Sequence, residues 1–225
     1  MADRAKATTL REQAYGSFTQ HLLARDLRAG QFISQRELVE LTGLKLGAIR
    51  ELIPRLETEG LVRTVPKRGM QIAHVDLKLI RDAFQFRQFL EVEAVALYAR
   101  EAPEAELRQI RREHDAVIET CSKALTGEGI TPELVDQAQQ VDWAMHDRVI
   151  DALGNKIIAD AYRVNSVKLR LVRQEQTRLN NSLVLSTMQE HILIIEALEA
   201  RNPRRAREAM RKHINQAWAR AVEQT

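Results

Sequence analysis

Cysteine, glycine, proline and aromatic residues are all scarce in this chain of 225 residues. It contains one cysteine, Cys121, with 9 glycines, 5 prolines and an aromatic fraction of 4%. A single cysteine excludes an internal disulfide framework and a four-cysteine zinc ribbon, and so little glycine and proline excludes collagen-like and low-complexity chains. The hydrophobic fraction of 44% is high enough to bury a core, so one or two folded domains are expected.

Long apolar runs are also missing. No stretch approaches the roughly 20 apolar residues that span a bilayer. The N-terminal residues MADRAKATTLRE lack the apolar centre of a signal peptide. The sequence therefore predicts a soluble, cytoplasmic protein with no membrane partner.

Charge is unevenly distributed along the chain. Residues 1–73 contain 12 Lys and Arg against 8 Asp and Glu, whereas residues 74–225 contain 22 against 23. A small basic region attached to a larger, nearly neutral one is typical of a nucleic-acid-binding domain followed by a sensing or assembly domain. Two domains are therefore expected, residues 1–73 and residues 74–225.

The basic region has the pattern of a winged helix-turn-helix. Apolar residues recur with a helical period over about residues 10–28. A second helix is expected to begin at Ser34, whose Ser-Gln-Arg-Glu sequence is a capping box, and to end near Gly43. A third helix is expected over about 45–59, followed by two short extended runs around a turn at 66–69. Two helices joined by a tight glycine turn and followed by a basic hairpin predict DNA binding.

Five cations in this region are the candidates for DNA contacts. Lys45 and Arg50 lie in the first turns of the third helix, the part of a recognition helix that meets base edges in the major groove. Arg36 at the start of the second helix, and Lys67 and Arg68 at the tip of the hairpin, are placed to contact phosphates. The alternative for each of them is an ordinary solvated surface charge, so the prediction depends on the whole series of elements.

The larger region has the pattern of an all-helical, antiparallel bundle. Six helices are expected, at about residues 77–100, 103–124, 132–153, 156–180, 184–200 and 203–222. Glycine, asparagine and proline separate them, and such short connections favour antiparallel neighbours. The predicted fold class is therefore mainly α, a winged helix-turn-helix followed by a helical bundle.

Polar residues interrupt the apolar stripes of three bundle helices. Asp142 and His146 are four residues apart on one apolar face, and His191 and His213 lie on apolar faces of two later helices. Buried polar groups need partners. One interpretation is a divalent metal, because neutral imidazoles and a carboxylate suit zinc first, with nickel or manganese as alternatives. The other is a set of core histidines that bond to the backbone, and the pattern alone leaves both open.

Four short motifs of the basic region carry a family resemblance. They are Arg36-Glu37-Leu38, Ile49-Arg50-Glu51, the run from Arg55 to Val62, and Pro66-Lys67-Arg68-Gly69. These motifs resemble the GntR family of bacterial transcription regulators, in which the arginines matching Arg36 and Arg50 contact DNA and the glycine matching Gly69 approaches it closely. The chain departs from the family at Lys45-Leu46-Gly47-Ala48, where Ser-Arg-Thr-Pro is usual. The resemblance therefore implies DNA binding but no particular operator sequence.

The helical region carries a second resemblance. Asp142-Trp-Ala-Met-His146, His191 within Gln-Glu-His-Ile, and His213 within Arg-Lys-His-Ile match the metal ligands of FCD ligand-binding domains. Such domains occur in the FadR-type branch of GntR regulators. The resemblance implies a metal at these four residues and a small carboxylate effector on its open coordination positions.

Two further residues are candidates for holding that effector. Arg87 matches an arginine that recurs in the family's first bundle helix, and a guanidinium can pair with a carboxylate through two parallel hydrogen bonds. The alternative for Arg87 is a structural ion pair with Glu91, four residues later. Asn165 is a polar residue within an apolar stripe of the fourth bundle helix. The remaining histidines, His21, His74 and His114, lack comparable neighbours and are expected to be structural or exposed.

These features together predict an effector-responsive, metal-containing transcription regulator that is not an enzyme. A single winged helix reads one half-site, so a homodimer on a palindromic, double-stranded DNA operator is expected. The resemblance implies repression, the commoner mode in the family, and a small carboxylate ligand is expected to release the protein from DNA. One alternative is a zinc-dependent hydrolytic enzyme built on the bundle, although no HExxH, P-loop or dinucleotide-binding pattern occurs. The other is an architectural DNA-binding protein without a ligand.

Overall fold

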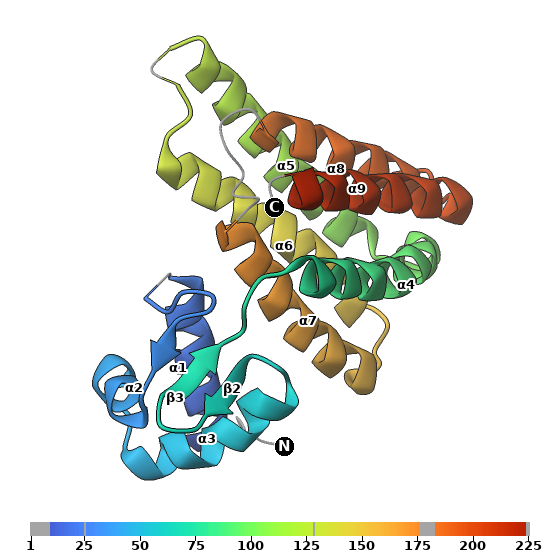
Figure 1. Ribbon diagram of the computed structural model, residues 1–225. Coiled ribbons are helices and arrows are strands. Elements are labelled where there is room, and N and C mark those ends of the chain that lie inside the picture. The colour runs from blue at the N-terminus through green and yellow to red at the C-terminus, as the bar shows by residue number, and fades with distance from the viewer. Residues whose placement is uncertain (1–9, 25, 128, 176–182, 224–225) are drawn as a thin grey trace, which may run out of the picture. The chain divides into compact units, whose positions relative to one another are not determined.

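The computed structural model describes residues 10–24, 26–127, 129–175 and 183–223, which are mainly helical (Figure 1). These residues fall into two compact units. The first contains the described residues up to Asp76 together with Arg170–Glu175, and the second contains the remainder. The mainly α fold predicted from the sequence is confirmed.

The described part of the first unit combines three helices with a small sheet. Its elements are α1 (Leu10–Leu23), β1 (Phe32–Ile33), α2 (Gln35–Thr42), α3 (Leu46–Thr58), β2 (Val62–Val65) and β3 (Gly69–Ile72). The strands form one antiparallel sheet in the order β1-β3-β2. Fully buried side chains from the three helices, among them Phe18, Leu38 and Ile49, form the core. This is the expected winged helix-turn-helix with one additional strand, β1, whose two residues are too few to show a strand period.

Local capping determines where α2 begins and ends. Ser34 Oγ accepts a hydrogen bond from the Glu37 amide at 3.1 Å, and the Ser34 amide donates to Glu37 Oε2 at 2.7 Å. Both halves of the predicted capping box are therefore present. Gly43 ends the helix with a φ of 67°, a left-handed conformation that glycine adopts without steric cost. Gly43 therefore sets the turn that leads from α2 into α3.

The first helix ends earlier than the sequence predicted. α1 stops at Leu23 rather than at about residue 28. The amides of Asp26 and Leu27 both donate to the His21 carbonyl, at 3.0 and 3.3 Å, and the side chain of Leu27 is fully buried. The chain therefore leaves the helix in a turn that places Leu27 in the core, a tertiary effect that helical periodicity does not register.

The described part of the second unit is built from six helices. They are α4 (Leu77–Glu101), α5 (Glu104–Leu125), α6 (Pro132–Asp151), α7 (Lys156–Glu175), α8 (Leu183–Glu199) and α9 (Pro203–Glu223), with the end of α7, Arg170–Glu175, belonging to the first unit. The predicted helices agree with these to within a few residues, while the predicted end of the fourth, at about residue 180, lies outside the described residues. α4 packs along α9, α8 packs against α5 and α9, and α6 contacts α4, α5 and α8 (Figure 1). Among the helices that the structure describes, none has the length and apolar character needed to cross a bilayer.

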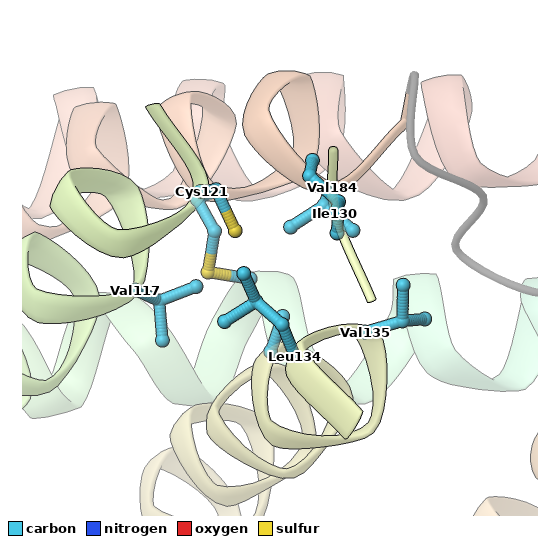
Figure 2. Packing of buried hydrophobic residues seen from close by; sticks show 8 residues of the cluster. Val117, Cys121, Ile130, Leu134, Val135 and Val184 are labelled. Carbon is cyan, nitrogen blue, oxygen red and sulfur yellow. The ribbon is translucent and has the colours of Figure 1, made fainter. Parts of the chain in front are cut away.

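An apolar cluster holds α5, α6 and α8 together. Its buried members are Val117, Cys121, Ile130, Leu134, Val135, Ala138, Val184 and Met188. Figure 2 shows their side chains meeting between the three helices. Each large aliphatic side chain that becomes buried contributes about 1.5–3 kcal/mol. About one helical turn beyond this cluster, the same three helices carry His114, Asp142 and His191, so the apolar packing sets the spacing of a polar site.

Candidate metal centre and DNA-contacting residues

Four buried polar side chains converge inside the second unit. Asp142 and His146 come from α6, His191 from α8 and His213 from α9. Each of these residues is at most 3% exposed. One potential ligand atom from each lies within 4.8 Å of the corresponding atoms of the other three. The helical periodicity that predicted these residues to face a common interior is therefore matched by their geometry.

The distances between these atoms fit a divalent metal. The Nε2 atom of His191 lies 3.3 Å from Asp142 Oδ1 and 3.4 Å from His213 Nε2. Zinc–nitrogen bonds of about 2.0–2.1 Å in a tetrahedral site place the ligand atoms about 3.3 Å apart. His146 Nε2 is further out, at 4.0 Å from Asp142 Oδ1. His191 thus has metal-like spacing from both Asp142 and His213, and the ligand atom of His146 lies within 4.8 Å of the other three.

Carboxylates behind two of the histidines determine where their protons lie. His146 Nδ1 is 2.7 Å from Glu91 Oε2, and His213 Nδ1 is 2.8 Å from Glu190 Oε2. An ionised carboxylate only accepts hydrogen bonds, so His213 carries its proton on Nδ1 and directs the lone pair of Nε2 into the cluster, and the charge of Glu91 favours the same tautomer of His146. Metal-binding histidines characteristically have such carboxylate partners.

Arg87 contacts the cluster from α4. Its Nη2 atom lies 2.6 Å from His146 Nε2 and 3.4 Å from His213 Nε2. Because a guanidinium group only donates, this contact also requires lone pairs on the two Nε2 atoms. Arg87 Nε donates to Glu91 Oε1 at 2.5 Å, and the Tyr162 hydroxyl donates to the same oxygen at 2.7 Å. The ion pair between Arg87 and Glu91 is therefore present, and a role of Arg87 in effector binding stays a prediction.

Burial keeps the imidazoles of His146 and His213 neutral. Burial and the nearby charge of Arg87 lower the pKa of His146 to about 4, and burial with the neighbouring rings holds the pKa of His213 well below its usual value. Burial alone would raise the pKa of Glu91, but Arg87 and His146 hold it at about 2. At neutral pH the site thus presents His146 and His213 as neutral imidazoles with an ionised carboxylate behind His146, the protonation states that metal binding requires.

Three residues of the site were not selected from the sequence. The sequence indicates Glu91 only as a partner of Arg87, gives no role to Glu190, and predicts that His114 is structural or exposed. His114 is fully buried, and its Nε2 atom lies 3.0 Å from His191 Nδ1. The one sequence signal for Glu190 is that it precedes His191, whereas the partners of Glu91 and His114 come from distant helices.

Asn165, the second candidate for effector binding, is buried on α7. Its Nδ2 atom donates to the Ala83 carbonyl at 3.0 Å. The hydrogen bond connects α7 to α4, the helix that carries Arg87. A role of Asn165 in effector binding stays a prediction.

The candidate DNA contacts of the first unit are all exposed. They are Arg36, Lys45, Arg50, Lys67 and Arg68. Arg36 pairs with Glu40 at 3.1 Å, and Arg50 Nε donates to Gln35 Oε1 at 3.3 Å. The guanidinium carbon of Arg68 lies 3.7 Å from the centre of the Phe32 ring, which connects the hairpin tip to β1. These contacts leave the cations at the surface, as DNA binding requires.

Gly69 is required by the fold of the hairpin. Its φ is +87°, and a Cβ atom at this position would lie 2.8 Å from the Ile33 carbonyl oxygen on β1. Side chains rarely adopt that backbone conformation, and the neighbouring atom is backbone that cannot easily move. The close approach of this glycine to DNA stays a prediction.

Comparison with known families covers both units. Residues 10–72 match the family described as bacterial regulatory proteins, gntR family, and residues 82–216 match the FCD domain family. A Streptomyces ambofaciens protein named "Uncharacterized HTH-type transcriptional regulator in unstable DNA locus" is 28% identical over 207 residues. That alignment covers 92% of this chain and 82% of the relative.

Solved structures share the fold. E. coli McbR/YncC superimposes with a TM-score of 0.77 at 16% identity, covering 97% of this chain and 99% of that one. The metal-free FCD domain of the regulator TM0439 gives a TM-score of 0.54 at 24% identity, covering 68% of this chain and 97% of that one. At these identities the likeness is one of architecture.

Proposed function

Because the chain belongs to the GntR family of bacterial regulatory proteins and carries an FCD domain, we propose that it is a metal-containing repressor that a small carboxylate releases from DNA. The chain is a DNA-binding transcription regulator, and its relatives are regulators rather than enzymes. The zinc-dependent hydrolase considered from the sequence is therefore wrong. The proposal adds the metal, the ligand and the sign of regulation.

The observation that carries the proposal is the convergence of Asp142 with the three imidazoles. One ring nitrogen from each histidine and a carboxylate oxygen of Asp142 lie within 4.8 Å of one another, and all four residues are buried. Arg87 donates to the nitrogens of His146 and His213, whereas Asp142 Oδ1 and His191 Nε2 face each other at 3.3 Å, and a cation would bind both of these atoms. Zinc is the first choice for this ligand set, with nickel or manganese as alternatives. When bound, the ion would supply a Lewis acid whose remaining positions accept an anionic oxygen.

The charges in and directly behind the cluster favour a ligand with a single negative charge. Among the described residues there, the carboxylates are Asp142, Glu91 and Glu190, and the guanidinium groups are Arg87 and Arg220. With neutral imidazoles this group carries one excess negative charge, which a divalent ion changes to one excess positive charge. A monocarboxylate brings the sum to zero, and unbalanced buried charge is costly. An architectural DNA-binding protein without a ligand would have no need for this cluster of buried charged residues.

Arg87 is the residue proposed to pair with the ligand's carboxylate. Its side chain is 3% exposed and already contacts two of the ligand atoms, His146 Nε2 and His213 Nε2. Burial would lower the pKa of Arg87, but Glu91 and Tyr162 raise it, so the group stays charged. Asn165, which holds α7 to α4, is proposed as a second contact with the effector.

Ligand binding would be coupled to DNA binding through a homodimer. Two winged helices related by two-fold symmetry read a palindromic operator, with Lys45 and Arg50 in the groove and the other cations on phosphates. Regulation then requires that the ligand favour a state in which the two winged helices no longer fit the half-sites. A coupling free energy of about 1–3 kcal/mol is sufficient for a useful response.

The test measures DNA affinity with and without metal and ligand. DNA fragments selected by the full-length protein from a random pool would be titrated by fluorescence anisotropy, with zinc and a panel of small mono- and dicarboxylates. We expect a monocarboxylate to weaken binding about 5–150-fold in the zinc-loaded protein. The double variant His146→Ala/His191→Ala should bind DNA but lose the response, whereas His21→Ala/His74→Ala, which removes two histidines outside the cluster, should keep it. An equal response in both double variants would contradict the proposal.

A further inference from the structure

A fourth histidine lies directly behind the candidate metal ligands. His114, on α5, is fully buried, and its ring centre is 5.2 Å from that of His191. His114 Nε2 is 3.0 Å from His191 Nδ1, and His114 Nδ1 is 2.8 Å from the Ile110 carbonyl oxygen. His114 is not one of the four residues whose ligand atoms meet, and α5 supplies no ligand.

The Ile110 carbonyl determines the position of the proton on His114. A carbonyl oxygen only accepts, so His114 must carry its proton on Nδ1. A neutral imidazole carries a single proton, so a His114 ring with its proton on Nδ1 has a lone pair on Nε2. His114 Nε2 is then an acceptor, and His191 Nδ1 must be the donor in the 3.0 Å contact. Consequently the lone pair of His191 is on Nε2, directed toward Asp142 and His213.

We propose that His114 is a positioning residue that fixes the tautomer of His191 and so directs its Nε2 lone pair to the metal. The effect of His114 on metal affinity rests on the proposed function, whereas its effect on the tautomer of His191 does not. His146 and His213 are oriented by the carboxylates of Glu91 and Glu190, whereas His191 is oriented by a neutral ring. The affinity for the metal would therefore depend on a residue of α5, although no atom of α5 binds the metal.

The competing tautomer shows why the acceptor matters. Without an acceptor at position 114, the His191 Nδ1–H group would be buried with no partner. Moving the proton to Nε2 would give it Asp142 Oδ1, 3.3 Å away, as a new acceptor. That tautomer has no lone pair for the metal, so the acceptor at residue 114 selects the metal-binding form.

Three variants separate this role from simple packing. His114→Leu removes the acceptor at similar volume. His114→Gln places an amide oxygen near the position of the ring Nε2 and so restores an acceptor. His74→Leu is the matched control, because His74 is exposed and lies in the first unit. Zinc affinity would be measured in full-length protein by competition with a chromogenic chelator, and the His191 tautomer by long-range proton–nitrogen NMR in zinc-free protein.

We expect His114→Leu to weaken zinc binding about 10–100-fold, the usual effect of removing a partner behind a metal ligand. His114→Gln should stay within a few-fold of wild type, and His74→Leu should not change the affinity. The zinc-free wild type should carry its His191 proton on Nδ1, and the leucine variant should lose that signal.

Three results would overturn the proposal. They are unchanged zinc affinity in His114→Leu, equal losses in the leucine and glutamine variants, and a His191 proton on Nε2 in the zinc-free wild type. If the wild type binds no zinc at all, the proposed function fails. The tautomer of His191 in the zinc-free wild type and in His114→Gln then still decides the role of His114.

Discussion

The two units place their functional residues in opposite environments. In the winged helix-turn-helix the candidate cations are exposed and make single contacts, such as Arg36 with Glu40 and Arg50 with Gln35. In the bundle the candidate ligands are buried, and the three histidines contact side chains from other helices, namely Glu91, Glu190 and His114. Exposed charges can change without loss of stability, whereas each buried polar group depends on its partner. Function should therefore be separable from stability in the first unit and inseparable from it in the second.

The largest effect should come from breaking the ion pair behind the metal ligands. Glu91→Gln leaves Arg87 buried without its anionic partner, and removing one member of a buried pair costs about 3–5 kcal/mol. Urea denaturation of zinc-free protein would measure the loss. Glu93→Gln is the matched control, because Glu93 lies two residues further along α4 and forms an exposed pair with Arg207. Its effect should be about 0–1 kcal/mol, and equal losses would remove the distinction between buried and exposed pairs.

Gly69 is the exception within the first unit, because its role is structural. Gly69→Ala forces a side chain into a left-handed backbone conformation beside the Ile33 carbonyl, and we expect a destabilisation of about 1–3 kcal/mol. Gly16→Ala is the control, since Gly16 lies within α1 and a Cβ there meets nothing within 4 Å. That substitution should stabilise by about 0.5–1 kcal/mol. An unchanged thermal stability of the Gly69→Ala variant would contradict the steric explanation.

Substitution of Arg50 should affect DNA recognition without affecting the fold. Arg50→Ala is expected to weaken binding to the selected DNA by about 1–3 kcal/mol and to relax base preference at one position. The free energy of unfolding should change by no more than about 0.5 kcal/mol. Arg63→Ala serves as the control, because Arg63 is exposed on β2 but bonds to Gln71 and is not a predicted contact. A footprint unchanged in Arg50→Ala would contradict the assignment of α3 as the recognition helix.

The smallest effects should come from the phosphate contacts. Arg36→Ala and Lys67→Ala are each expected to weaken binding to all sequences similarly, and to reduce the salt slope by about 1 for each chain bound. Titrations at several salt concentrations would measure this slope. Sequence-dependent losses would instead place these residues at base edges.

The sequence predicted features that depend on local signals. The capping box at Ser34, the bundle helices and the inward-facing positions of Asp142 and His146 follow from spacing along a single helix. It did not predict features that depend on contacts between distant segments, such as β1 or the partners of His191 and His213. His114 and His191 are 77 residues apart, and no periodicity within one helix relates them. The premature end of α1 has a similar cause, the burial of Leu27.

X-ray absorption at the zinc edge tests the central claim most directly. Full-length protein reconstituted with zinc should bind about one ion per chain, with imidazole nitrogens at about 2.0–2.1 Å and a carboxylate oxygen at about 2.0–2.2 Å. The His146→Ala/His191→Ala variant, prepared identically, should lose both the ion and this spectrum. Equal zinc content and the same imidazole signal in the variant would show that the metal binds elsewhere and would contradict the account.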